Sequence, residues 1–179
     1  MVAIFDDVGL RYVVGGSIAS SLMGEPRSTV DIDIAVSIDG PRVEPLLDAC
    51  AADFFVPVEF AREAIATRSS FNLIERSGAL KVDVFVLGDD LLDRNQMARR
   101  VQVTPSDLVA PIWVTSAEDQ VLRKLDWFVR GGSTSDRQWR DIVGLLRIQA
   151  GHLDLDYLRM TANAIDLASD LERAIDAAS

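Results

Sequence analysis

Two stretches of the chain show a strict alternation of apolar and polar positions, and this pattern predicts β-strands. Over residues 29–36, valine and isoleucine alternate with Asp31 and Asp33, and over residues 80–87 leucine and valine alternate with charged or aromatic side chains. A period of two places the two sets of side chains on opposite faces of a strand. A Ser-Gly turn separates the second stretch from another strand-like segment, residues 71–76, so we predict a β-hairpin there.

Apolar positions spaced by three and four predict helices elsewhere in the chain. We expect helices over residues 18–23, 43–52, 59–66, 89–98, 117–130 and 135–150, one or two more over 155–178, and short strands at 10–14, 54–58 and 101–103. Ser116 stands three residues before Asp119, a pattern typical of a helix start. The chain therefore has a mixed first part and a helical last third. We predict an α+β fold, a mixed β-sheet flanked by helices with a helical C-terminal extension.

Composition and charge narrow the class of protein. The 179 residues are 49% hydrophobic and 26% charged, which suits an ordinary globular chain. We expect a core over residues 1–108 and a helical region over 109–179 that packs on it, or one continuous domain. The formal net charge of -10 argues against a broad nucleic-acid surface, although basic residues exceed acidic ones between Arg123 and Arg147. With no signal-peptide pattern and no long apolar run, we predict a cytoplasmic protein that does not span a membrane.

The rare side chains exclude several kinds of site. Cys50 is the only cysteine and lies in an apolar helical stretch, so we expect a buried thiol and no cysteine-rich zinc site. His152 is the only histidine and follows a glycine at a helix junction, which disfavours Ser-His-Asp catalysis. For Trp113, Trp127 and Trp139 we expect core packing rather than base stacking.

Asp31, Asp33 and Asp83 are the leading candidates for chemistry. Aspartate is depleted in strands, and side chains at i and i+2 share one face with Cα atoms about 6.6 Å apart. Asp83 occupies the polar face of the second alternating strand. Three carboxylates on neighbouring strands suit a site for hard divalent cations of the kind that assist phosphoryl transfer. The alternative is three independent, solvated aspartates.

Gly15, Gly16 and Ser17 follow the first predicted strand and begin a helix. Glycines allow close approach of the backbone to a ligand, and a helix N-terminus offers free amide groups to phosphate. An ordinary turn is the alternative interpretation. Neither Gly-x-Gly-x-x-Gly nor Gly-x-x-x-x-Gly-Lys-Ser/Thr occurs, so Rossmann and P-loop sites lack support.

In combination, residues 13–17, 31–34 and 81–84 resemble the nucleotidyltransferase superfamily typified by DNA polymerase β, over roughly residues 8–88. The resemblance implies a nucleotidyltransferase-like fold and transfer of a nucleoside monophosphate from an NTP to an acceptor hydroxyl. It implies these site residues: Asp31, Asp33 and Asp83 as catalytic residues and ligands of two Mg²⁺ or Mn²⁺ ions, and Gly15, Gly16 and Ser17 as nucleotide-binding residues.

Residues 116–125 and 135–142 look like the helical part of AbiEii-type nucleotidyltransferases, which include toxins of toxin-antitoxin pairs. In this resemblance Lys124 matches a lysine that contacts the triphosphate, Asp141 matches a closing aspartate, and Arg137 is placed for phosphate or acceptor. The chain departs from that family where Arg140 replaces a lysine-rich element. The alternative is a solvated basic face.

Arg27 lies in the loop before the aspartate pair, where it would reach a phosphate or serve only as a surface charge. The acceptor stays open among tRNA, protein and small molecule, and the toxin resemblance implies an antitoxin partner. Two alternatives to an enzyme are a non-catalytic nucleotide-binding or interaction module with the same fold and a purely structural protein.

Overall fold

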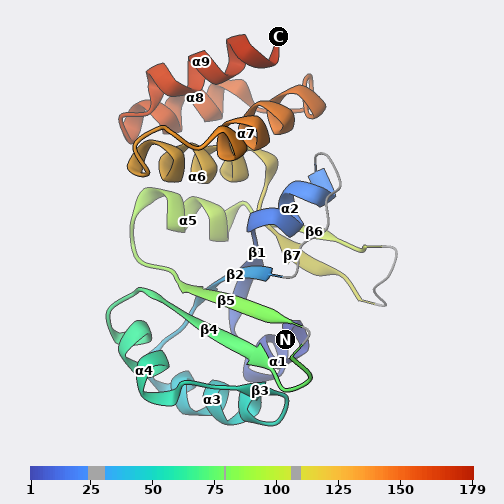
Figure 1. Ribbon diagram of the computed structural model, residues 1–179, viewed down its shortest axis with the longest axis vertical. Coiled ribbons are helices and arrows are strands. Elements are labelled where there is room, and N and C mark those ends of the chain that lie inside the picture. Colours follow the sequence, from blue (N-terminus) through green and yellow to red (C-terminus); the bar gives the residue numbers. More distant parts are fainter. Residues whose placement is uncertain (24–30, 79, 106–109) are drawn as a thin grey trace.

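The computed structural model describes residues 1–23, 31–78, 80–105 and 110–179 (Figure 1). Its strands are β1 (Arg11–Val14), β2 (Asp31–Ser37), β3 (Phe54–Phe55), β4 (Ser70–Glu75), β5 (Lys81–Val86), β6 (Val101–Val103) and β7 (Ile112–Val114). Its helices are α1 (Val2–Val8), α2 (Gly16–Met23), α3 (Val43–Ala51), α4 (Val58–Ala66), α5 (Leu91–Ala98), α6 (Ala117–Arg130), α7 (Asp136–Ile148), α8 (Leu155–Ala164) and α9 (Ala168–Ala178). Over the described ranges the strands form one sheet in the order β3-β4-β5-β2-β1-β7-β6.

The centre of the sheet places the candidate aspartates next to one another. β2 and β5 pair in parallel, with Asp31 opposite Lys81 and Asp33 opposite Asp83. β4 pairs with β5 in antiparallel orientation, which confirms the predicted hairpin. Because residues in register on neighbouring strands project to the same face, Asp33 and Asp83 share one side of the sheet.

The two faces of this sheet have different roles. Ile34, Val36 and Val84 project into the main hydrophobic core, where buried side chains of α3 and α4 cover them. Ala35 and Phe85, one position away, belong to a small cluster on the opposite face. The period-two pattern read from the sequence therefore separates a core face from the face that carries the aspartates.

The helical C-terminal extension is confirmed. The Ser116 side chain accepts a hydrogen bond from the backbone amide of Asp119 and caps α6 as the sequence predicts. Helices α6 to α9 surround a second hydrophobic cluster and stack at one end of the molecule, with α3 and α4 at the other end (Figure 1). β7, which follows residue 109, pairs with β1 in the sheet. The division at residues 108 and 109 lies outside the described residues and stays a prediction.

Some elements differ from the expectations. α1 and β7 are not predicted. β7 is held in the sheet by pairing with β1 and β6, and its own residues do not show these long-range contacts. The strand predicted at residues 54–58 is wrong after Phe55, since Val58 begins α4. Pro57 lacks the amide hydrogen that would continue the ladder and precedes the first residue of that helix. In the described ranges no helix combines the length and the hydropathy that a membrane crossing needs.

Candidate functional site

Gly16 packs directly on the carboxylate of Asp33. Its φ of +56° lies in the left-handed region, and a Cβ built on it would stand 1.7 Å from Oδ2 of Asp33. The amide of Gly15 donates to the Asp33 carbonyl oxygen at 2.9 Å, and the amide of Ser17 hydrogen-bonds the Asp33 carboxylate. The turn between β1 and α2 thus holds the N-terminus of α2 against the carboxylate of Asp33.

Asp33 and Asp83 form an electrostatically strained pair. Burial, followed by the nearby charge of Asp83, raises the pKa of Asp33 above its ordinary value, while the Ser17 amide and the Lys124 charge oppose the rise. Lys81 balances the other carboxylate, because its Nζ lies 2.9 Å from Oδ1 and 3.0 Å from Oδ2 of Asp83. This contact raises the pKa of Lys81. Two carboxylates on adjacent strands therefore share a face with one ammonium group.

The carboxylates fit a divalent cation in part. Carboxylate oxygens are the donors that Mg²⁺ and Mn²⁺ prefer, and Asp33 and Asp83 stand in register on adjacent strands. Within the described part of the chain, however, no three His, Cys, Asp or Glu side chains gather closely enough to hold one metal ion. Asp31 lies on the same face at the start of β2, two residues before Asp33.

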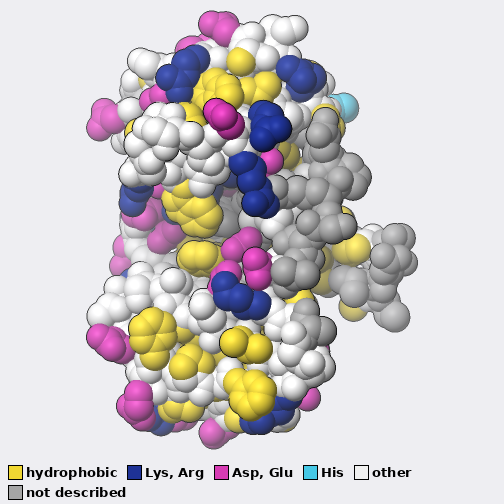
Figure 2. All heavy atoms as spheres, viewed as in Figure 1, with side chains coloured by type: hydrophobic (Ala, Val, Ile, Leu, Met, Phe, Trp, Pro, Cys, Tyr) yellow, Lys and Arg dark blue, Asp and Glu magenta, His cyan; other side chains and the backbone are white. Residues whose placement is uncertain are grey.

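A cavity of about 290 Å³ begins at Asp33 and extends between the sheet and helices α5 and α6. Helix α5 contributes Asp93 and Gln96 to its lining, and helix α6 contributes Gln120, Arg123, Lys124 and Trp127. The sheet and its connecting segments contribute Gly15, Gly16, Asp33, Ala35, Arg68 and Phe85. Figure 2 shows acidic, basic and hydrophobic side chains close together at mid-height, between the helical end and the sheet end. Four candidate residues, Gly15, Gly16, Asp33 and Lys124, therefore meet at one hollow, whereas Ser17, Asp31, Asp83 and Asp141 are not among the described residues that line it.

Lys124 and Asp141 come together across α6 and α7. Nζ of Lys124 lies 3.0 Å from Oδ2 of Asp141, and both side chains are largely buried. Lys124 also lines the cavity and is near enough to Asp33 to affect its pKa. Arg137 is exposed and is not among the residues that line the cavity. Arg27 lies outside the described residues.

Trp127 is a cavity residue that the sequence interpretation misses. We expected core packing, but its side chain is 39% exposed and its ring centroid lies 5.7 Å from that of Phe85. Trp113 and Trp139 do pack against the two hydrophobic clusters, as expected. The sequence offers only one signal for the difference. Trp127 falls three residues after Lys124, on the side of α6 that also carries that lysine.

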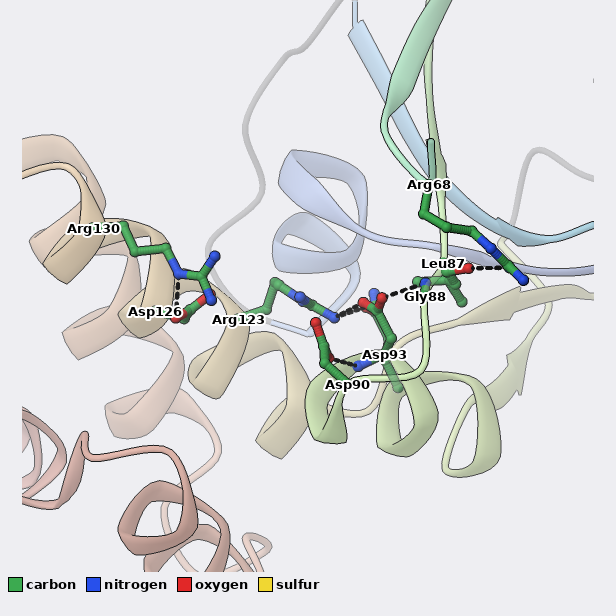
Figure 3. Close-up of polar contacts among 9 residues, drawn as sticks. Arg68, Leu87, Gly88, Asp90, Asp93, Arg123, Asp126 and Arg130 are labelled. Atoms are coloured by element: carbon green, nitrogen blue, oxygen red, sulfur yellow. Dashed lines mark hydrogen bonds and ion pairs between the residues drawn. The ribbon is translucent and has the colours of Figure 1, made fainter. Parts of the chain in front are cut away.

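An ion pair between α5 and α6 forms one wall of the cavity. The guanidinium of Arg123 lies 2.6 Å from Oδ1 of Asp93, and the other oxygen of Asp93 accepts the Gly88 amide at 2.6 Å. Figure 3 shows Arg123 pointing from α6 to Asp93, and Arg68 pointing to the carbonyl oxygen of Leu87. Because all these contacts link separate elements, they hold the cavity wall in a fixed place relative to the sheet.

A buried polar group anchors the start of α6. Asp119 is 2% exposed and accepts hydrogen bonds from the hydroxyl groups of Ser116, at 2.7 Å, and Tyr157, at 2.5 Å. Burial raises the pKa of Asp119 despite these hydrogen bonds. The network connects α6 to α8 and so fixes the helix that carries Lys124 and Trp127. Cys50 is buried in the other half, as predicted.

The structure is similar to solved nucleotidyltransferase-like proteins. No family model and no curated protein matches the sequence. An antigenic nucleotidyltransferase-like protein from Paracoccidioides brasiliensis superposes with a TM-score of 0.56 at 21% identity, covering 98% of this chain and 88% of that one. The antibiotic-resistance factor ANT(2'')-Ia gives 0.51 at 14% identity and coverages of 96% and 91%. The lincomycin-bound lincosamide adenylyltransferase LnuA gives 0.52 at 14% identity and coverages of 82% and 92%. At these identities the likeness establishes the nucleotidyltransferase-like fold and confirms that part of the sequence-based expectation.

Proposed function

We propose that this protein is a divalent-metal-dependent nucleotidyltransferase that moves a nucleoside monophosphate from an NTP to an acceptor hydroxyl. One observation carries the proposal. The Gly16 backbone at the N-terminus of α2 packs on Asp33, which lines the cavity and stands in register with Asp83 on the neighbouring strand. A phosphate-binding helix start and acidic oxygens thereby meet at a hollow of a size that suits a small ligand.

Different residues of the chain bind the phosphates, the nucleoside and the metal ions in the proposed reaction. The amides at the start of α2 and the Lys124 ammonium bind the negatively charged phosphates. The rings of Phe85 and Trp127 offer apolar surface to the nucleoside inside the cavity. Asp31, Asp33 and Asp83 would hold Mg²⁺ or Mn²⁺, which supplies charge neutralisation for the phosphates and for the attacking oxygen.

In the transfer itself, the acceptor oxygen forms a bond to the α-phosphorus and the bond from this phosphorus to the bridging oxygen breaks. Pyrophosphate leaves with the bond electrons, and Asp83 accepts the proton of the acceptor hydroxyl. Lys124, held by Asp141, stays close to the departing negative charge. The positions of these groups on rigid strands and a capped helix favour preorganised binding.

For the acceptor we favour a small molecule over tRNA or protein. The net charge of -10 disfavours a broad contact with nucleic acid. Two proteins of similar fold are described as an antibiotic-resistance factor and as a lincosamide adenylyltransferase with lincomycin bound. The AbiEii resemblance, the toxin role with an antitoxin partner, and the cytoplasmic location stay predictions.

The experiment is a label-transfer assay with each α-³²P-labelled NTP. The purified full chain is incubated with Mg²⁺ or Mn²⁺ and, in separate reactions, a panel of small hydroxyl compounds, total tRNA or a cell lysate. The active-site variant is Asp33→Asn, and the matched control is Asp48→Asn, which removes the same charge from an exposed position on α3. We expect transfer by the wild type and by the Asp48 variant and at least a hundredfold loss, about 3 kcal/mol of activation free energy, in the Asp33 variant.

The main alternative is a nucleotide-binding module without chemistry. It predicts that an NTP with Mn²⁺ raises the melting temperature of the wild type while no label moves to any acceptor. Equal transfer by the wild type and by Asp33→Asn would refute the assignment of the site. Absence of both transfer and nucleotide stabilisation would leave the structural-protein alternative.

A further inference from the structure

We propose that the Lys81 ammonium competes with divalent metal ions for the carboxylate of Asp83. This internal cation thereby sets the concentration of divalent metal that the protein needs to fill its site. The inference rests on the proposed function, because it concerns the same carboxylates. Lys81 is one of two lysines in the sequence, and the proposed reaction assigns no role to it. The other, Lys124, is already bound to Asp141 in the cavity wall.

The position of Lys81 is determined by the sheet. It begins β5, stands opposite Asp31 in the register, and lies two residues before Asp83, so all three side chains project to one face. Its ammonium contacts both oxygens of Asp83, at 2.9 and 3.0 Å. The charges of Asp31 and Asp33 also attract it. One ammonium thus pairs with Asp83 and lies in the field of Asp31 and Asp33, the other carboxylates to which the proposed function assigns the metal.

The ion pair is suited to exchange. The side chain of Lys81 is 42% exposed, whereas that of Asp83 is 18% exposed, so the lysine reaches inward from the rim and has open solvent behind it. Ion pairs with one partner this exposed contribute little to stability, and a long flexible side chain can leave at little cost. A divalent cation that binds the oxygens of Asp83 must displace the ammonium, and the displaced charge still repels the cation from nearby.

The test is Mn²⁺ binding to the full chain without nucleotide, followed through the electron paramagnetic resonance signal of free Mn²⁺. In Lys81→Met the stem is kept and the charge is removed, so we expect Mn²⁺ to bind about three- to tenfold more tightly than to the wild type. In Lys81→Arg the affinity should stay near the wild-type value, because the positive charge is retained. Circular dichroism melts in EDTA check that each variant is folded.

Arg62→Met is the matched control for the loss of one positive charge. Arg62 on α4 has the same 42% side-chain exposure and also pairs with two carboxylates, Glu44 and Glu59. We expect this change to leave Mn²⁺ affinity within about twofold of wild type, since exposed charges beyond roughly 10 Å are screened in 0.1 M salt. An equal gain in both Met variants would mean that net charge alone explains the effect and would overturn the proposal.

The remaining outcomes separate this inference from the proposed function. If Asp83→Asn abolishes Mn²⁺ binding and Lys81→Met leaves it unchanged or weakens it, Lys81 does not compete and only the inference fails. If Lys81→Met binds Mn²⁺ where the wild type does not, the proposal is supported in its strongest form. If the wild type and every Lys81 variant fail to bind Mn²⁺, both the metal site and the competition are refuted.

Discussion

Gly16→Ala should disrupt the candidate site although it adds only one methyl group. The new Cβ would lie 1.7 Å from Oδ2, 2.4 Å from Cγ and 2.7 Å from Cβ of Asp33, far inside any contact distance. Asp33 sits on the central strand β2 and cannot retreat as a flexible surface side chain would. The turn or the carboxylate must move, and either movement separates the start of α2 from Asp33.

Two separate effects of this substitution lower the free energy of unfolding. A left-handed conformation costs an alanine about 1–2 kcal/mol relative to glycine, and the φ of Gly16 is +56°. Forcing an extra carbon into a packed site costs about 1–3 kcal/mol more. A chain of this length loses about 2–4 °C of melting temperature per kcal/mol, so we expect Gly16→Ala to melt roughly 4–20 °C below the wild type.

Gly15→Ala is the control, because the sequence pattern treats the two glycines alike and the structure does not. A Cβ at Gly15 would meet its nearest neighbour, Nε2 of Gln96, at 3.6 Å, an ordinary contact. Thermal unfolding in EDTA, followed by circular dichroism, should show at most about 2–4 °C of loss for this variant, which corresponds to about 1 kcal/mol. Equal melting temperatures for the two alanine variants would refute the close packing of Gly16 on Asp33.

Two further predictions concern buried carboxylates. Because burial and Asp83 raise the pKa of Asp33, ionising it costs stability, and the cost grows as pH rises from the pKa in the unfolded chain to the raised pKa. Asp33→Asn should therefore melt about 2–4 °C above the wild type in EDTA at pH 7, with the gap closing below about pH 4, and a lower melting temperature at pH 7 would contradict this. Tyr157→Phe removes a hydrogen bond from buried Asp119 and should lower the free energy of unfolding by about 1–3 kcal/mol in urea titrations. An unchanged urea midpoint would show that Asp119 does not depend on this hydroxyl.

The sequence pattern predicted a strand or helix correctly where the conformation that its own residues prefer is also the one that buries their apolar side chains. The alternation in β2 and β5 fixed both the strands and the face of each side chain, because a period of two leaves no other way to bury valine and isoleucine. Ser116 predicted the start of α6 for an equally local reason, since its hydroxyl caps an amide three residues away. β7 escaped prediction because its stability comes from pairing with β1 and β6, far away in sequence.

Trp127 illustrates what a residue pattern leaves undecided. A tryptophan at helical spacing is compatible with a core and with a cavity wall, and only the packing of α6 over Phe85 decides between them. The same holds for Arg123, whose partner Asp93 lies on another helix. Long-range pairs of this kind depend on how helices dock, which local preferences do not encode.

The sequence by itself predicted which residues are chemically suited to bind phosphate and metal, because glycines before a helix let the backbone approach a phosphate and aspartates on one strand face offer oxygen donors to a cation. Only the tertiary structure decided how these residues are arranged. The strand register set Asp33 against Asp83, the left-handed turn at Gly16 placed α2 on that pair, and α6 closed the cavity with Lys124. Asp83 has its partner Lys81 for a local reason, since side chains two residues apart on one strand project together.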